Sequence, residues 1–234
     1  MINPKQIREE IIKLSRETNN GHVAPAMSCV EILISIYNIL SDKDRFIFSK
    51  GHGCLALYAV LRELGYNPNI YKGHPDLDIE NGIHTTTGSL GHGLPIAVGM
   101  ALARKLTNKA GKIYVLISDG ELQEGTTWES LLIANHHKLN NLVVIIDKNN
   151  IQALDYTKNI LKLNDIGDKL ESFGAITSFV DGHNLDEITT CFNTLNEEYY
   201  NVIVANTIKG KGFSIMENNP EWHNRIPMDS ELIA

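Results

Sequence analysis

Two uninterrupted runs of apolar residues dominate the middle of the chain. The first extends from Ile113 to Ile117 and the second from Leu142 to Ile146, and such runs are typical of strands that are buried on both faces. Between them, Thr126 and Glu129 have the spacing of a capping box, which predicts a helix that ends near Lys138. A strand, a helix and a strand with short connections predict a parallel βαβ unit.

Short apolar runs and helical stripes also alternate on both sides of this unit. Helix caps, apolar spacing and terminal glycines predict further helices. One helix begins at Asn3, and another runs from the capping box of Ser28 and Glu31 to Tyr37. The others are predicted over Leu55–Leu64, Leu94–Leu106 and Leu163–Phe173, and from Asn184 to about Glu198. Further strands are predicted over Arg45–Phe48, Ile176–Val180 and Asn201–Asn206. The helix over Leu94–Leu106 is apolar on nearly all sides, so we expect it to be buried, within the fold or at a subunit contact.

Polar residues follow both central strands at the point where each strand ends. Asp119 and Gly120 come after the first strand, and Asn149 comes after the second. The carboxyl ends of neighbouring parallel strands share the edge at which open α/β sheets bind ligands. A carboxylate, an amide oxygen and a carbonyl just after Asn149 are hard donors that suit Mg²⁺, whose other positions take phosphate oxygens and water. Asp119-Gly120 alone, or Asn149 alone, is more simply explained as a turn after a strand. The presence of both at neighbouring strand ends favours a site for magnesium and phosphate.

Composition narrows the class of protein. The 234 residues include 43% hydrophobic and 21% charged positions, which suits a single α/β domain over residues 1–234. The net charge of −7 and the lack of a basic run argue against nucleic-acid binding. Three cysteines without CxxC spacing suggest neither disulfides nor zinc. No signal peptide or apolar run of membrane-spanning length is present, so we expect a cytoplasmic enzyme without a membrane partner.

Histidines and glycines gather in the loops. The chain has nine histidines, and five of them directly follow a glycine: His22, His52, His74, His92 and His183. A single loop histidine is usually plain polar surface, but the repetition favours a function. Zinc is weakly supported because no HExxH spacing occurs. Imidazoles that bind phosphate or transfer protons fit better.

Together these motifs resemble those of the transketolase family. Asp119-Gly120 followed by Asn149-Asn150 is similar to the family's thiamine-diphosphate motif, with Ser118 in place of the usual first glycine. The further similar segments are Asn20-Gly21-His22, Ser49 to His52, Gly73-His74-Pro75 and Thr86 to Gly93, which resembles Thr-Thr-Gly-Pro-Leu-Gly-Gln-Gly with His92 in place of glutamine. Val23 to Ala26 departs from the family's glycine-rich step, on the expected substrate side. The resemblance runs from about residue 4 to His223 and implies a three-layer α/β/α thiamine-diphosphate-binding fold with a mostly parallel central sheet.

The resemblance also implies roles for individual residues. Asp119, Asn149 and the carbonyl of Ile151 would hold Mg²⁺. The residues expected to contact thiamine diphosphate are His52, Gly88, Leu90, Asp119, Gly120, Glu121, Asn149, Ile151 and His223. His22 and His74 would face the substrate as catalytic imidazoles, and Glu124 matches a family glutamate that links two cofactor sites across a dimer.

A complete transketolase continues into a pyrimidine-binding domain, which this sequence does not contain. The resemblance therefore implies the first subunit of a split transketolase, which moves a two-carbon ketol unit from a ketose to an aldehyde. The expected partners are a C-terminal transketolase subunit, in a dimer of heterodimers, and sugar or sugar-phosphate substrates. The alternatives are the alpha subunit of a 2-oxo-acid dehydrogenase, a fragment of 1-deoxyxylulose-phosphate synthase type, and a non-catalytic cofactor-binding subunit.

Overall fold

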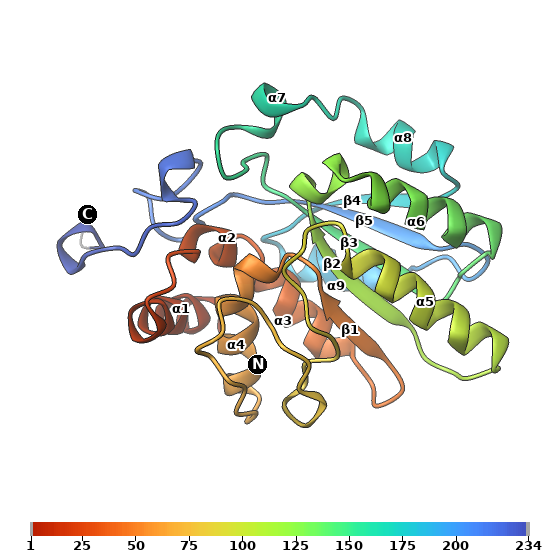
Figure 1. Cartoon of the computed structure of the whole chain (residues 1–234), viewed down its shortest axis with the longest axis horizontal. Helices are drawn as coiled ribbons and strands as arrows, with labels where there is room; N and C mark the ends of the chain where they lie inside the picture. The colour runs from red at the N-terminus through yellow and green to blue at the C-terminus, as the bar shows by residue number, and fades with distance from the viewer. Residues whose placement is uncertain (1, 233–234) are drawn as a thin grey trace.

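A five-stranded parallel sheet forms the centre of the molecule (Figure 1). The computed structural model describes residues 2–232. The strands are β1 (Arg45–Phe48), β2 (Ile113–Ser118), β3 (Leu142–Lys148), β4 (Ile176–Asp181) and β5 (Asn201–Asn206), in the spatial order β1-β2-β3-β5-β4. Every neighbouring pair of these strands is parallel. The predicted βαβ unit is confirmed, because β2 pairs directly with β3 and places Ser118 beside Asp147.

Helices cover both faces of the sheet and complete a three-layer α/β/α fold. One apolar core contains α1 (Pro4–Thr18), α2 (Val23–Met27), α3 (Val30–Ile39), α4 (Cys54–Glu63) and α9 (Leu185–Asn193). The other contains α5 (Gly93–Leu106), α6 (Gly125–His136) and α8 (Ile166–Ser172). Strand β2 contributes Leu116 to the first core and Val115 to the second, because successive side chains of a strand point to opposite faces. The apolar runs are continuous for this reason.

The segment after β5 returns to the beginning of the fold. It lies beside α1 and α2 at one end of the molecule (Figure 1). The amide of Gly210 donates to the carbonyl of Ala24 over 3.1 Å, and the amide of Arg225 donates to the carbonyl of Gly21 over 2.8 Å. A Cβ at Gly21 would lie only 2.3 Å from the Asn224 side chain, so this close packing requires a glycine.

Two predicted caps are wrong. Helix α6 begins at Gly125, and the Thr126 hydroxyl donates to the Gly91 carbonyl instead of capping the helix. The Ser28 hydroxyl likewise donates to Asp147, while Glu31 pairs with Arg8. In both cases the side chain that local spacing predicted as a helix cap instead forms a hydrogen bond or ion pair with a residue distant in sequence.

Helix α9 has the predicted Asn184 cap but ends at Asn193, five residues before the predicted end near Glu198.

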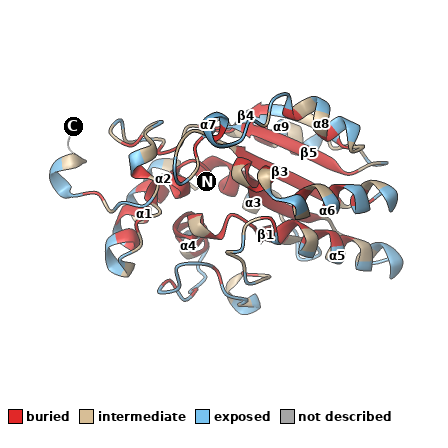
Figure 2. Ribbon diagram, turned by 45° about the horizontal axis from the view of Figure 1, so that its top comes forward, coloured by how far each residue is buried: buried red, intermediate tan, exposed pale blue. Residues whose placement is uncertain are grey.

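Helix α5 is only partly buried. Leu94, Ala97, Val98 and Ala101 face the core, whereas Ile96 is 39% exposed. On the neighbouring helix α6, Leu132 is 56% and Ile133 46% exposed. Figure 2 shows exposed and intermediate positions along the outer sides of both helices. Ile96, Leu132 and Ile133, which we call the uncovered apolar strip, therefore remain exposed on two adjacent helices of the single chain.

Within residues 2–232, no helix is long and apolar enough to cross a membrane.

Candidate active site

A cavity of about 310 Å³ opens at the carboxyl edge of the sheet. Its wall combines residues that follow β1, β2, β3 and β5, including His52, His74, Gly88, Leu90, Asp119, Gly120, Gln123, Glu124, Asn149, Ile151, Gln152, Lys209 and His223. Almost all the residues expected at the site therefore border one space, although they are distributed over much of the sequence. A parallel sheet produces this convergence because all its strands end at the same edge.

A larger hollow of about 450 Å³ borders Asp119 and is lined by Lys148, Lys158 and Lys162. Its outer wall is the loop that carries α7 (Thr157–Ile160). None of the site histidines lines this second hollow. We assign the site to the smaller cavity, because the histidines, the glycines and the candidate metal ligands meet there.

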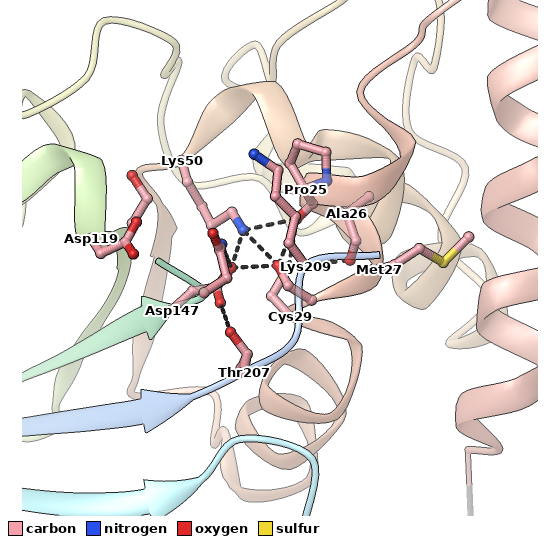
Figure 3. Close-up of polar contacts among 12 residues, drawn as sticks. Pro25, Ala26, Met27, Cys29, Lys50, Asp119, Asp147, Thr207 and Lys209 are labelled. Carbon is pink, nitrogen blue, oxygen red and sulfur yellow. Dashed lines mark hydrogen bonds and ion pairs between the residues drawn. The ribbon is translucent and has the colours of Figure 1, made fainter. Parts of the chain in front are cut away.

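A buried ion pair lies on one side of the site (Figure 3). Nζ of Lys50, two residues before His52, pairs with Oδ2 of Asp147 and also donates to the Pro25 carbonyl over 2.8 Å. Asp147 accepts further hydrogen bonds from the hydroxyls of Ser28 and Thr207. Burial alone would lower the pKa of Lys50, but the Asp147 charge raises it. Lys50 is therefore charged and occupied by internal contacts, which fix the end of β1 against β3.

The three candidate metal ligands lie together at the ends of β2 and β3. Oδ2 of Asp119 accepts a 2.6 Å hydrogen bond from the Asn150 amide, and Oδ1 of Asn149 accepts one of 3.1 Å from the Ile151 amide. Burial and the Asp147 charge raise the pKa of Asp119 to about 7. Among the described residues, no three His, Cys, Asp or Glu side chains could hold a metal together. A metal here would rely on amide and carbonyl oxygens beside a single carboxylate, a set that suits Mg²⁺.

Three imidazoles form a compact group, of which His52 and His223 line the cavity, whereas His22 packs against these two rings and does not line it. The ring centroid of His22 lies 5.7 Å from that of His52 and 5.5 Å from that of His223, and the rings of His52 and His223 stack at 5.7 Å. Burial and neighbouring positive charge lower the pKa of all three, that of His223 to about 3. The rings are therefore neutral near pH 7 and can each donate one N–H, without adding a positive charge.

Lys209 supplies the positive charge that these imidazoles lack. Its Nζ donates to the carbonyls of Ile151 over 3.0 Å and Gln152 over 3.3 Å, and to Nδ1 of His223 over 2.7 Å. Burial and the Lys50 charge lower its pKa to about 7, and an anion in the cavity would raise it again. None of the sequence motifs predicts a role for this residue. The available signal was a lysine directly before Gly210, shortly after an apolar strand.

Of the remaining predicted residues, some line the cavity and one supports its loops from outside the cavity. A Cβ on Gly88, at φ +143°, would meet the His74 ring at 2.8 Å, so His74 packs directly on this glycine. Glu124 lines the cavity and is exposed. Glu121 does not line it: its buried carboxylate accepts hydrogen bonds from the Ser118 amide, the Gly91 amide and the Ser49 hydroxyl. Glu121 therefore joins three loops of the site from behind.

Comparison with known proteins identifies the family. The family described as "Transketolase, thiamine diphosphate binding domain" matches residues 5–232. The chain belongs to the transketolase family. One subunit of the apulose-4-phosphate transketolase of Actinobacillus succinogenes is 38% identical over 97% of this chain and 91% of its own length. The 6-deoxy-6-sulfo-D-fructose transketolase subunit SqwG of a Clostridium species is 37% identical, over 92% and 86%.

Full-length transketolases match the same region. Human transketolase is 33% identical over 94% of this chain but only 38% of its own length. The structure of Campylobacter jejuni transketolase is similar at 26% identity and a TM-score of 0.85, over 95% of this chain and 39% of that one. The protein is therefore a transketolase-type transferase chain with the thiamine-diphosphate-binding fold, and it corresponds to about two fifths of the long transketolases.

Proposed function

We propose that this chain is the cofactor-binding subunit of a split transketolase, which transfers a two-carbon ketol unit from a ketose to an aldehyde. The observation that carries this proposal is the joint presence in one cavity of an oxygen donor set, a lysine and neutral imidazoles. Bound thiamine diphosphate supplies the carbanion chemistry of such a transfer. The protein chain binds and orients the cofactor and moves protons.

The cavity's chemistry fits Mg²⁺ and a diphosphate. Asp119, Asn149 and the carbonyl of Ile151 would hold Mg²⁺, while Gly120 leaves room for a phosphate because a Cβ there would meet nothing closer than 3.6 Å. His52, His223 and Lys209 would face the diphosphate. The buried amide Nε2 of Gln152, without a hydrogen-bond partner among the described residues, lies in the same wall and is a further donor for the anion.

The substrate is proposed to enter beside His22 and His74, with Gly88 and Leu90 next to the cofactor rings. Each imidazole can hold or release a proton on a substrate hydroxyl. The names of two relatives specify a sugar phosphate and a sulfo sugar. We therefore expect a sugar substrate with a terminal anionic group, a phosphate or a sulfonate.

The complete enzyme needs a second polypeptide with the pyrimidine-binding domain. Support comes from the relatives that are named as subunits and from the uncovered strip of Ile96, Leu132 and Ile133. Exposed apolar patches of this kind commonly mark protein interfaces. The proposed assembly is a dimer of heterodimers, in which unlike chains enclose the cofactor.

Reconstitution tests this function. The purified chain is supplied with thiamine diphosphate and Mg²⁺, and two-carbon transfer from hydroxypyruvate is measured with and without a candidate pyrimidine-domain subunit. We expect turnover only in the mixture, because the isolated chain leaves the cofactor ring in water. Equal turnover by the chain alone would refute the split enzyme, and a preference for pyruvate over hydroxypyruvate would refute ketol transfer.

A further inference from the structure

A buried polar cluster lies outside the cavity and joins three distant segments. It consists of Arg8 on α1, Glu31 on α3 and His183 in the turn between β4 and α9. Both terminal nitrogens of Arg8 pair with the Glu31 carboxylate at 2.7 Å, and Nδ1 of His183 lies 3.0 Å from Oε2 of Glu31. We call these three residues the Arg8–Glu31–His183 cluster.

The cluster ends on the main chain around Lys209. The amide of Ile208 donates to Nε2 of His183 over 2.8 Å, and Nε of Arg8 donates to the carbonyl of Lys211 over 2.8 Å. Because Nε2 of His183 accepts, Nδ1 carries the ring proton and donates to Glu31. The two contacts flank Lys209 on both sides. The cluster therefore fixes the backbone from Ile208 to Lys211 without touching the Lys209 side chain.

Lys209 depends on such a fixed backbone. A lysine side chain has many rotamers, and ordering it costs conformational entropy. Its Nζ must nevertheless meet the carbonyl of Ile151 and the ring of His223 at once. Gly210, at φ +80°, turns the chain directly after it, and a small rotation of this turn would move the ammonium out of the site.

A purely stabilising role explains the cluster less well. A buried ion pair loses hydration on folding and is often no more stabilising than apolar residues of similar size. Its geometric effect is specific, because the guanidinium and the imidazole each keep one atom for the main chain of the same turn.

We propose that the Arg8–Glu31–His183 cluster is a positioning device that holds the Lys209 ammonium in the cofactor site. This inference rests on the proposed function, since it assumes that Lys209 serves a bound diphosphate. His183 and Arg8 are positioning residues, because they act through the main chain of the turn and do not touch the cavity.

A double-mutant cycle separates positioning from general stability. Calorimetry measures the binding of Mg²⁺–thiamine diphosphate to two variants of the 234-residue chain. His183→Asn loses the acceptor for the Ile208 amide, whereas the amide oxygen of His183→Gln can replace Nε2. Loss of this acceptor should raise the dissociation constant about fivefold or more, whereas His183→Gln should stay within about twofold. In a Lys209→Met background the effect of His183→Asn should disappear, because coupled residues are not additive.

Controls make each outcome decisive. Lys211→Ala keeps the carbonyl that Arg8 contacts and should bind the cofactor like the wild type. Arg8→Lys, which keeps the charge but loses the Lys211 contact, enters the same cycle if His183→Asn does not fold. If the cluster variant and Lys209→Met change the dissociation constant additively, the positioning role is overturned, but the proposed cofactor site is not. Absence of cofactor binding by the wild-type chain when it is mixed with its partner subunit, or unchanged binding by Lys209→Met, would instead refute the proposed cofactor site.

Discussion

Nζ of Lys209 donates a 3.0 Å hydrogen bond to the main-chain carbonyl of Ile151. The contact joins the segment after β5 to the loop after β3, 58 residues earlier in the sequence. The carbonyl is one of the proposed metal ligands, and Lys209 is the one lysine or arginine among the described residues that line the cavity. Metal and diphosphate binding are therefore expected to depend on the same contact.

Replacing Lys209 should weaken cofactor binding. Lys209→Met keeps the length of the side chain but removes the charge and the bonds to Ile151 and His223. We expect the dissociation constant of Mg²⁺–thiamine diphosphate to rise at least about tenfold, equivalent to about 1.4 kcal/mol. Calorimetry on the purified chain measures it, with Lys211→Ala as the control. A rise in the dissociation constant of less than about threefold would show that Lys209 does not contribute to cofactor binding.

Asp119→Asn should abolish the magnesium dependence of cofactor binding. The amide oxygen of asparagine can still accept from the Asn150 amide, so the fold should persist. The negative charge that Mg²⁺ requires is lost, and titration with Mg²⁺ should no longer increase cofactor affinity. Asp168→Asn, an exposed carboxylate on α8, is the matched control. Unchanged magnesium dependence in Asp119→Asn would contradict the assignment.

His74→Ala should separate catalysis from binding. The imidazole borders the cavity and packs on Gly88, but it makes none of the contacts of the candidate metal ligands. General acid–base catalysis typically contributes about 10²–10⁴-fold, so we expect a loss of this order in the reconstituted enzyme at saturating cofactor. The cofactor dissociation constant should change less than about threefold. A variant with full turnover would exclude His74 from proton transfer.

Glu31→Gln should change the acid stability of the chain. Burial opposes ionisation of Glu31, but hydrogen bonds from His183 and Arg8 outweigh it and lower its pKa from 4.5 to about 2. Its stabilising contribution is therefore complete above pH 4.5 and is lost as the pH falls toward 2. Removing one partner of a buried pair costs about 3–5 kcal/mol.

Urea unfolding at two pH values measures this effect. The free-energy difference between wild type and Glu31→Gln should be largest at neutral pH and smaller by about 1.4 kcal/mol at pH 3.5. Glu171→Gln, an exposed position on α8, should show no such narrowing. A difference that is independent of pH would indicate that Glu31 is not ionised in the folded chain.

Leu132→Lys should prevent assembly without unfolding the chain. Leu132 is 56% exposed on α6 and belongs to the uncovered apolar strip, so a charge there costs the single chain little. At an interface the same lysine would be desolvated without a partner. Light scattering should show smaller particles for the variant mixed with its partner than for the wild-type mixture. Equal particle sizes would place the interface elsewhere.

The sequence predicted the strands well because their apolar runs are local signals. The run from Leu142 to Ile146 can only be satisfied by burial on both faces, and β3 lies at the centre of the sheet. The caps at Thr126 and Ser28 were wrong because a hydroxyl has several possible acceptors. Gly91 and Asp147, which are distant in sequence, provide the acceptors.

The placement of Asp119 and Asn149 beside one cavity was predictable, because a sequence motif fixes both residues at the ends of neighbouring strands. Lys209 was missed because its role depends on a turn that Arg8 and His183 shape from other parts of the fold. The pairing of Lys50 with Asp147 is likewise a tertiary fact, since 97 residues separate them. Spacing patterns do not encode such contacts.

The return of the last segment to Gly21 and Ala24 has a consequence for synthesis of the protein on the ribosome. All five strands precede Thr207, whereas Lys209 and His223 follow it. The nascent chain can therefore assemble its sheet before the pocket exists, and the segment that follows β5 completes the pocket later. A ligand stabilises only the state that binds it. Thiamine diphosphate is thus expected to stabilise only subunits that have completed folding, and it should not assist formation of the sheet.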